Sequence, residues 1–307
     1  MTVKQYLAFD IGGTATKYGV LNEQGDILEV GKFSSRNANG FHVLEEIKKI
    51  VDSKSGIVNG LAISAPGFID TETGYFENGG SFRDFDQFNM KSYLEKEIAL
   101  PITIENDVNC VAYAEKWLGN AKEHTDFVCT TIGTGIGGAL FLNGRLYRGV
   151  SNRAGEFGYM INQNKSQSIL TNTLNHNATI LAVRKQYASA KKIPLNKVSG
   201  ETVFQAFDNG DQDAKGIITG FYDSIAKMIY HLFYIINPRK LLVGGGISSR
   251  PSFLTELKEQ LSKYGIDDEL LDVDTCYFKN QSGIIGATYH HIQKMESESF
   301  NNLIAEK

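Results

Sequence analysis

The stretch YLAFDIGGTATKYGVL, residues 6–21, predicts a strand, a glycine turn and a returning strand. Residues 6–10 form an apolar run that is too short for a helix, and residues 17–21 form a second β-like run beyond the Gly12-Gly13 pair. Residues 22–25 have the composition of a turn, so we expect residues 27–33 to add a third strand. Together these residues predict a three-stranded antiparallel meander.

The same design returns at residues 127–147, FVCTTIGTGIGGALFLNGRLY. It reads as a strand, a glycine-rich turn, a second strand, an Asn143-Gly144 hairpin turn and a third strand. A repeat after roughly 120 residues indicates domain duplication, because solenoid repeats are about 20–50 residues long. We therefore expect two related domains, with the boundary near residues 117–120.

Between and beyond the two copies, buried strands alternate with helices. Strands are expected at residues 60–64, 102–104 and 241–243, and a helix at 108–118 with Asn106 or Asp107 as its N-cap and Gly119 as its C-terminal stop. Other helical patterns cover residues 41–51, 177–190, 214–236 and 284–295. This alternation predicts the α/β class, with parallel sheets whose faces are covered.

Composition excludes several classes of protein. The 307 residues are 42% hydrophobic and 21% charged, as in folded globular proteins, and the net charge of −4 comes without a dense Lys/Arg cluster for nucleic acid. No signal peptide and no membrane-spanning apolar run is present, so we expect a soluble, cytoplasmic protein with no membrane partner. The cysteines, Cys110, Cys129 and Cys276, are far apart in the sequence, which disfavours disulfides and a cysteine-based zinc site.

The glycines of the two hairpins suggest a ligand. Such clusters indicate either unusual φ angles or the close approach of another group, and a phosphate fits the second description. Neither the P-loop nor the Rossmann pattern is present. One such hairpin is more simply a tight turn, but two of them, with Asp10 and Thr14 beside the first and Thr134 in the second, favour phosphate binding. A third glycine run follows the strand at 241–243 and is placed to back a nucleotide.

Six motifs occur in the order typical of one family. They are DIGGT (10–14), END (105–107), GTGIGG (133–138), NGRLYRG (143–149), AGEFG (154–158) and VGGGIS (243–248). Each is weak alone, but the ordered set resembles the ROK family of bacterial sugar kinases and repressors over nearly the whole chain. The resemblance implies a duplicated actin-like ATPase fold, with ATP and sugar in a cleft between two domains. These would be residues 1–118, completed by a helix over 290–307, and residues 119–289.

The resemblance assigns the nucleotide site residue by residue. Gly12, Gly13 and Thr14 would face the β- and γ-phosphates, with Lys17 as an additional charge. Asp10 would hold Mg²⁺, directly or through water; the alternative is a buried acid that caps a turn, which is costly without a cation or donors. From the second domain, Thr134 and Gly135 would contact the phosphates, and Gly244 and Gly245 would lie against the adenosine.

The resemblance assigns the chemistry to Asp107, as the general base that takes the proton of the attacking hydroxyl. Position alone favours a simple N-cap, and the two roles are compatible. The implied sugar-binding residues are Gly67, Asn78, Asn106, Glu156 and Tyr159. For Asn78 an Asn-Gly turn is an equally good interpretation, and for Glu156 the alternative is a surface glutamate.

The chain departs from the family beside Glu156. Typical members read G-E-[IL]-G-H and continue into a C-x-C-G-x-x-G-C zinc motif, whereas Gly158 is followed here by Tyr159 and by residues 160–168 without a cysteine. We therefore predict that no zinc is bound, and that packing or hydrogen bonds hold this wall of the sugar site. The six histidines show no ligand spacing and are interpreted as structural or exposed.

The resemblance implies an ATP- and Mg²⁺-dependent hexose kinase that phosphorylates the 6-hydroxyl of glucose or a β-glucoside. N-acetylmannosamine or another hexose is the alternative, since Gly79-Gly80 leaves room for an acetamido group. Family repressors carry a helix-turn-helix domain, which we do not expect because nine residues precede Asp10. A sugar-responsive regulator without that domain remains a second class. An actin- or chaperone-like ATPase would need subdomains for which the chain is short. Family resemblance also implies a homodimer.

Overall fold

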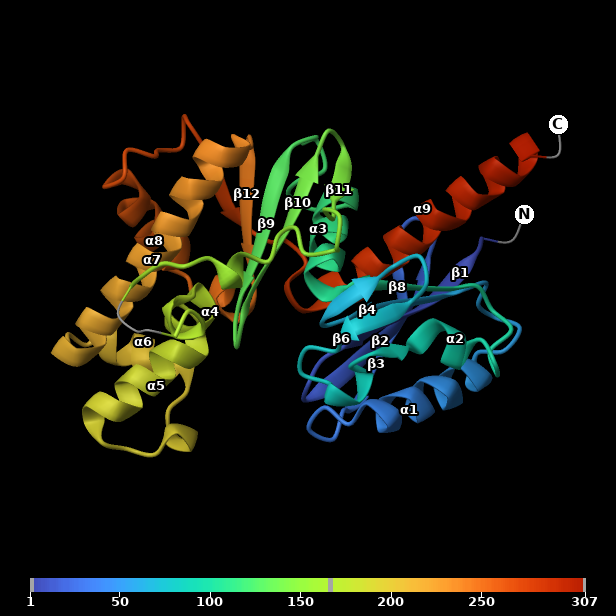
Figure 1. Cartoon of the computed structure of the whole chain (residues 1–307), viewed down its shortest axis with the longest axis horizontal. Helices are drawn as coiled ribbons and strands as arrows, with labels where there is room; N and C mark the ends of the chain where they lie inside the picture. The colour runs from blue at the N-terminus through green and yellow to red at the C-terminus, as the bar shows by residue number, and fades with distance from the viewer. Residues whose placement is uncertain (1–2, 165–167, 306–307) are drawn as a thin grey trace. The chain divides into compact units, whose positions relative to one another are not determined.

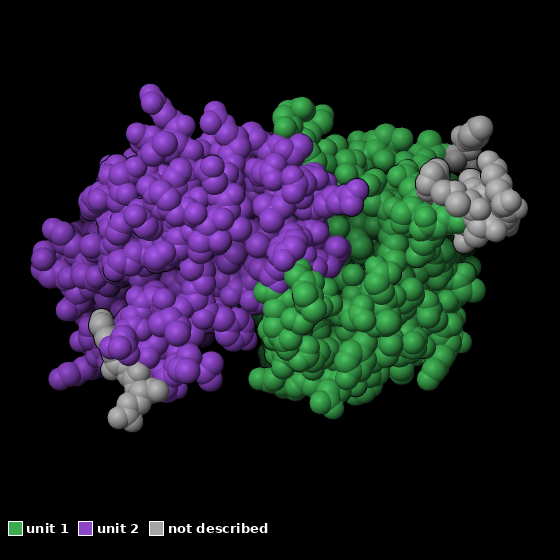
Figure 2. Space-filling view, turned by 45° about the horizontal axis from the view of Figure 1, so that its top comes forward, with its two compact units in different colours: residues 1–123, 149–153, 280–307 green, residues 124–148, 154–279 purple. Residues whose placement is uncertain are grey.

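The structure, a computed structural model, describes residues 3–164 and 168–305. It divides into two compact units, which Figure 2 shows in different colours. Unit 1 comprises Met1–Glu123, Gly149–Arg153 and Asn280–Lys307, and unit 2 comprises His124–Arg148 and Ala154–Lys279. The domain boundaries expected at 118/119 and 289/290 stay predictions. Residues 1–2, 165–167 and 306–307 of the two predicted domains lie outside the described residues.

The main sheet of unit 1 has the strand order β3-β2-β1-β4-β8. The strands are β1 (Gln5–Ile11), β2 (Ala15–Asn22), β3 (Ile27–Ser34), β4 (Leu61–Ala65) and β8 (Ile102–Asn106). The first three pair antiparallel, as the sequence predicts, and β1, β4 and β8 pair parallel. The carboxyl ends of these three parallel strands therefore meet at one edge of the sheet.

The sheet of unit 2 repeats this arrangement with the order β11-β10-β9-β12-β13. Its strands are β9 (Phe127–Ile132), β10 (Ile136–Leu142), β11 (Arg145–Tyr147), β12 (Lys240–Gly244) and β13 (Asp272–Thr275). Strands β9 to β11 form the antiparallel meander, while β12 and β13 add parallel strands beside β9. The predicted duplication is confirmed, because each sheet joins an antiparallel meander to two parallel strands.

Helices cover both faces of the sheet in unit 1, as Figure 1 shows. They are α1 (Gly40–Ser53), α2 (Met90–Leu94), α3 (Asp107–Trp117) and α9 (Ser282–Ala305), with a 3-10 turn at Arg83–Phe85. Leu7 and Phe9 of β1 join the core formed with α1, whereas Tyr6 and Asp10 face α9. A small sheet of β5 (Phe68–Asp70), β6 (Tyr75–Asn78) and β7 (Phe88–Asn89) was not predicted from the sequence.

Unit 2 packs its helices around one apolar core. They are α4 (Leu174–Asn177), α5 (Ile180–Lys191), α6 (Gly200–Asp208), α7 (Gln212–Ile236) and α8 (Phe253–Ser262), with 3-10 turns at Phe157–Tyr159, Leu170–Asn172, Leu195–Lys197 and Gly246–Ser249. A further 3-10 turn, Lys279–Gln281, spans the boundary between the two units in the sequence. The single helix expected at 177–190 is wrong at its start: the Thr179 hydroxyl accepts a hydrogen bond from the Ala182 amide at 3.0 Å and begins α5 as an N-cap. No described helix is long and apolar enough to cross a membrane.

Close contact between α3 and α9 fixes the helical face of unit 1. At Gly286 of α9, a Cβ atom would overlap the carbonyl oxygen of Cys110 in α3. At Gly283, one turn earlier, a Cβ atom would overlap the carboxyl group of Asp10. Glycine at these two positions lets α9 lie directly on α3 and on the end of β1.

We predict that Gly286→Ala lowers the free energy of unfolding by about 2 kcal/mol or more, because the added methyl group must displace backbone in a packed interface. The matched control is Gly216→Ala in α7, an exposed helical glycine with open space around it. This control should leave stability unchanged or raise it by up to about 1 kcal/mol through helix propensity. Urea unfolding measures both changes, and equal effects of the two substitutions would contradict the packing argument.

Candidate active-site residues in the two units

The junction between β8 and α3 places Asn106 and Asp107. The Asn106 side-chain oxygen accepts hydrogen bonds from the amides of Val108 at 2.9 Å and Asn109 at 3.2 Å, so Asn106 is the N-cap of α3. Asp107 is the first residue of the helix and is partly exposed. Of the two caps that the sequence allows, Asn106 is the one that forms, and the Asp107 carboxylate is placed at the positive end of the helix.

Three of the predicted sugar-binding residues come together in unit 1. The side-chain nitrogen of Asn106 donates a hydrogen bond to the carbonyl oxygen of Gly67 at 3.1 Å. Gly67 has a φ of +112°, and a Cβ atom there would overlap the carbonyl oxygen of Asn78. The Asn78 side-chain oxygen accepts a hydrogen bond from the Gly80 amide at 2.8 Å, so the Asn-Gly turn forms. Its predicted contact with a sugar stays a prediction.

Asp10 lies at the end of β1, on the edge that carries Asn106. The Ser64 hydroxyl donates a hydrogen bond to one carboxylate oxygen at 2.9 Å, and the Lys17 ammonium lies 3.9 Å from the other. Burial raises the pKa of Asp10, while Ser64 and Lys17 act in the opposite direction. A partly buried carboxylate, 24% exposed here, is stabilised by a nearby cation such as Mg²⁺.

The glycine turn beside Asp10 joins β1 to β2 and has ordinary backbone angles, since neither Gly12 nor Gly13 has a positive φ. A Cβ atom at Gly12 would lie 2.9 Å from the Ala15 carbonyl oxygen. The carbonyl oxygens of Gly13 and Thr14 accept backbone hydrogen bonds from the chain that follows β3. These contacts fix the turn before any ligand arrives, and they favour close approach over unusual φ as the reason for the glycines.

The hairpin loop of unit 2 lines a cavity of about 910 Å³, a size suited to a nucleotide-sized ligand. Gly133 is fixed by two backbone hydrogen bonds: its carbonyl accepts from Ile180 at the start of α5, and its amide donates to the Gly135 carbonyl. Gly133 and Thr134 line the cavity, whereas Gly135 is not among its lining residues. The remaining wall comes from α5, α6 and the segments at 196–199 and 246–251.

Residues of the third glycine run also line this cavity. Gly244 lies within β12, where a Cβ atom would be 3.1 Å from the Cys276 sulfur, and Gly245 adopts a φ of +86° against Ile132. The lining residues from this run are Gly246 and Ile247. The contacts of Gly244 and Gly245 with adenosine therefore stay predictions, and the structure places both residues outside the cavity wall.

Sequence reasoning missed the charged wall of this cavity. Arg250 pairs with Asp208 at 2.6 Å and with Glu256 at 2.6 Å, and its guanidinium lies 4.9 Å from the centre of the Phe204 ring. The hydrogen bond from Arg250 holds the pKa of Asp208 below its usual value. These residues come from α6, α8 and the loop between β12 and α8. Because they are distant in the sequence, no local motif predicts that they lie together.

A close fit between two glycines positions Glu156. Gly155 has a φ of +92°, and a Cβ atom there would overlap the Gly138 carbonyl oxygen, while a Cβ atom at Gly138 would overlap the Phe157 ring. Gly138 is therefore required for the packing of Phe157 and Gly155, and not for the approach of a ligand. Glu156 precedes the 3-10 turn at Phe157–Tyr159 and is partly exposed, and Tyr159 is 52% exposed. Both residues belong to unit 2, with Thr134 and Gly135.

Comparison with known proteins assigns this architecture. A sequence model of the ROK family matches residues 6–294. The chain belongs to the ROK family. A β-glucoside kinase of Listeria monocytogenes is 43% identical over 288 residues, covering 94% of this chain and 97% of the relative.

Solved structures agree with this assignment. A Listeria monocytogenes protein suggested to be an N-acetylmannosamine kinase has a TM-score of 0.90 at 42% identity, covering 95% of this chain and 99% of that one. A ROK family glucokinase from Streptomyces griseus, solved with glucose and AMPPNP, has a TM-score of 0.77 at 23% identity, covering 93% and 98%. The predicted family and its duplicated actin-like ATPase fold are confirmed.

The segment that replaces the ROK zinc loop is held by hydrogen bonds in its described part. The Asn162 amide donates to the Asn172 carbonyl at 3.1 Å, and the Leu174 amide donates to the Met160 carbonyl at 3.0 Å. The Asn162 side chain also donates to the Ser224 hydroxyl at 3.1 Å. Residues 165–167 lie outside the described residues. Within 3–164 and 168–305, no group of three or more His, Cys, Asp or Glu side chains is arranged to hold a metal.

We predict that the folded protein binds no stoichiometric zinc, because hydrogen bonds between residues 160–162 and 172–174 hold this segment in place of a metal. Elemental analysis of purified protein and thermal unfolding with and without EDTA test this. A structural zinc contributes folding free energy, so its removal would lower Tm. One zinc per chain together with a fall in Tm on chelation would contradict the prediction.

Proposed function

We propose that this chain is an ATP- and Mg²⁺-dependent sugar kinase that transfers the γ-phosphoryl group of ATP to the 6-hydroxyl of glucose or a β-glucoside. The observation that carries the proposal is the carboxyl edge of β1, β4 and β8. Asp10, Ser64 and Glu105 are successive partners in the strand register, and Asn106 and Asp107 follow directly. Ligands of open α/β sheets bind outside the carboxyl ends of strands, where these groups lie.

In this proposal Asp107 accepts the proton of the sugar 6-hydroxyl. The oxygen of that hydroxyl forms a bond to the γ-phosphorus while the bond between this phosphorus and ADP breaks, and ADP leaves. Asn106 hydrogen-bonds a sugar hydroxyl; the contact between its side chain and Gly67 holds its amide in place. Gly67, Asn78, Glu156 and Tyr159 contact the sugar. The reacting oxygen is thereby held in line, and alignment is the main contribution that a protein makes to phosphoryl transfer.

The partly buried carboxylate of Asp10 fits a magnesium site, because Mg²⁺ is commonly held by one or two carboxylates together with phosphate oxygens and water. When bound, Mg²⁺ neutralises charge on the transferring phosphoryl group. Gly12, Gly13, Thr14 and Lys17 contact the phosphates in this proposal, as do the hairpin residues Thr134 and Gly135 of unit 2. The unit 2 cavity, with Gly244 and Gly245 behind it, receives the adenosine. The glucokinase solved with AMPPNP supports ATP as the donor.

Two features favour a β-glucoside over N-acetylmannosamine. The curated relative at 43% identity is a β-glucoside kinase. The second is Tyr159, which stands where typical family members have histidine; its exposed ring suits stacking on a second sugar attached at C1. The alternative rests on the solved relative suggested to be an N-acetylmannosamine kinase. We further propose a homodimer that acts in the cytoplasm, as the family implies.

Asp107→Asn should lower kcat by about 10² to 10⁴-fold, because it keeps the size of the side chain and removes the base. Sugar binding should survive. Steady-state kinetics gives kcat, and calorimetry gives the sugar Kd. Asp52→Asn, an exposed acid near the end of α1, is the matched control and should behave as wild type. An Asp107→Asn enzyme that keeps half of its turnover would reject the assignment.

Cellobiose should be phosphorylated with a kcat/KM at least equal to that of glucose, because substitution at C1 leaves the reacting C6 end unchanged. A coupled assay for ADP release, run on glucose, cellobiose and N-acetylmannosamine, measures this. Activity on N-acetylmannosamine with none on glucosides would select the alternative substrate. If no ADP is released with any of the three sugars, the chain is better explained as a sugar-responsive regulator.

A further inference from the structure

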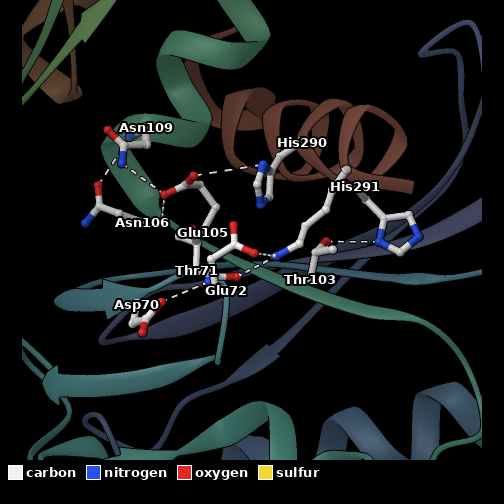
Figure 3. Close-up of polar contacts among 10 residues, drawn as sticks. Asp70, Thr71, Glu72, Thr103, Glu105, Asn106, Asn109, His290 and His291 are labelled. Carbon is white, nitrogen blue, oxygen red and sulfur yellow. Dashed lines mark hydrogen bonds and ion pairs between the residues drawn. The ribbon is translucent and has the colours of Figure 1, made fainter. Parts of the chain in front are cut away.

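Glu105 is a fully buried carboxylate that the proposed chemistry leaves unexplained. One carboxylate oxygen of Glu105 accepts two hydrogen bonds, from the Asn106 amide at 2.8 Å and from the Asn109 side chain at 2.9 Å. Its other oxygen faces a ring nitrogen of His290 in α9 at 3.9 Å, as Figure 3 shows. A buried carboxylate is costly unless such donors compensate it, so this arrangement has a specific structural use.

The two donors lie on either side of Asp107. The Asn106 amide belongs to the last residue of β8, and the Asn109 side chain belongs to the first turn of α3. One oxygen of Glu105 therefore ties the end of the strand to the start of the helix, and Asp107 is held between these two attachments. The direction of the Asp107 carboxylate depends on the geometry of this short turn.

Glu105 also brings negative charge to the turn. Burial, and after it the charge of Glu105, raises the pKa of the Cys110 thiol well above its ordinary value. Asp10 and Asp107 act on the same thiol in the same direction. Glu105 lies two residues before Asp107, at the end of the strand that leads directly into α3. A fixed negative charge near a carboxylate favours the protonated form of that carboxylate, which makes it a stronger base.

Titratable groups reach this turn from each element packed around it. Asp10 comes from β1, with Lys17 of β2 beside it, and Cys110 comes from α3. His290 comes from α9 and stacks on the ring of Tyr113 in α3 at a centroid distance of 5.5 Å. Among these groups, Glu105 is the one that accepts hydrogen bonds from both ends of the turn.

We propose that Glu105 is a positioning residue for phosphoryl transfer: it fixes the turn that carries Asn106 and Asp107 and places a buried carboxylate two residues before the proposed base. The inference rests on the proposed role of Asp107. It assigns a function to the first residue of the Glu105-Asn-Asp107 motif. Glu105 itself touches neither the substrate nor the transferred phosphoryl group in this account.

Glu105→Gln tests the proposal, because glutamine keeps the shape and one acceptor oxygen while it removes the charge. We expect kcat for glucose to fall about 10- to 100-fold with sugar KM changed by less than about 3-fold. We also expect the acid limb of the kcat against pH profile to move to lower pH by about half a unit or more, because Asp107 loses a neighbouring negative charge. Wild-type kcat and an unmoved acid limb would overturn the proposal.

Glu115→Gln is the matched control. Glu115 is a second fully buried glutamate on α3, and it accepts the Asn120 amide at 2.9 Å near the opposite end of the helix. Its substitution should lower Tm and leave kcat and the acid limb as in wild type. A purely structural role of Glu105 would give both variants the same pattern, a lower Tm with no displacement of the acid limb, and would overturn the proposal.

Asn109→Ala separates position from charge, since it removes one donor to Glu105 and keeps the carboxylate. It should lower kcat about 3- to 30-fold without moving the acid limb. If Glu105→Gln does not fold, Asn109→Ala is the test of the proposal, and a wild-type kcat in Asn109→Ala would overturn it. Asp107→Asn keeps the two hypotheses apart. An active Asp107→Asn enzyme rejects the proposed function, whereas an inactive one beside a normal Glu105→Gln enzyme rejects only this inference.

Discussion

Two carboxylates at the carboxyl ends of β1 and β8, the strands on either side of β4, are the constraint on which the site of unit 1 depends: Glu105 is fully buried, and the side chain of Asp10 is 24% exposed. Burying an ionised carboxylate costs several kcal/mol unless donors or cations compensate it. Asp10 receives the Ser64 hydroxyl and lies beside Lys17, and Glu105 receives an amide and the side chain of Asn109. Gly283 also brings the first turn of α9 onto Asp10, where the positive end of the helix dipole stabilises negative charge. The close contact of α9 therefore serves electrostatics as well as packing.

The duplicated sheet has diverged in what its glycines do. In unit 1 the turn at Gly12 and Gly13 is held tightly by backbone hydrogen bonds beside the partly buried Asp10. In unit 2, Gly138 is required because Phe157 and Gly155 pack against it, whereas Gly133 has open space around it and lines the cavity. One sequence pattern thus has two physical causes, and only three-dimensional neighbours distinguish them.

Much of the fold could be predicted because its strands and helices have strong local signals. The meanders, the parallel strands β4, β8 and β12, and α7 follow from apolar periodicity, and the cap of α3 follows from Asn106 or Asp107 at the strand end. The missed strands lack such signals: β13 reads Asp-Val-Asp-Thr, with one apolar side chain, and β5 to β7 are two to four residues long. The helices α6 and α8 were missed although apolar residues such as Phe253, Leu257 and Leu261 recur at helical spacing. The cavity wall could not be predicted because residues such as Arg250 and Phe204 are distant in sequence. The sequence identified Glu105 only as a member of the Glu105-Asn-Asp107 motif and predicted neither its burial nor its hydrogen bonds.

The most direct measurement is the position of the phosphate in the product. In the proposed function Asp107 acts at the C6 end of the sugar and substitution at C1 is tolerated, so the two ends of the substrate have separate roles. After reaction of the purified enzyme with ATP, Mg²⁺ and cellobiose, ¹H–³¹P correlation NMR identifies the oxygen that carries the phosphate. The account predicts a single product phosphorylated at the 6-oxygen of the non-reducing glucose. Phosphate on any other oxygen, or ADP formed without a sugar phosphate, would contradict it.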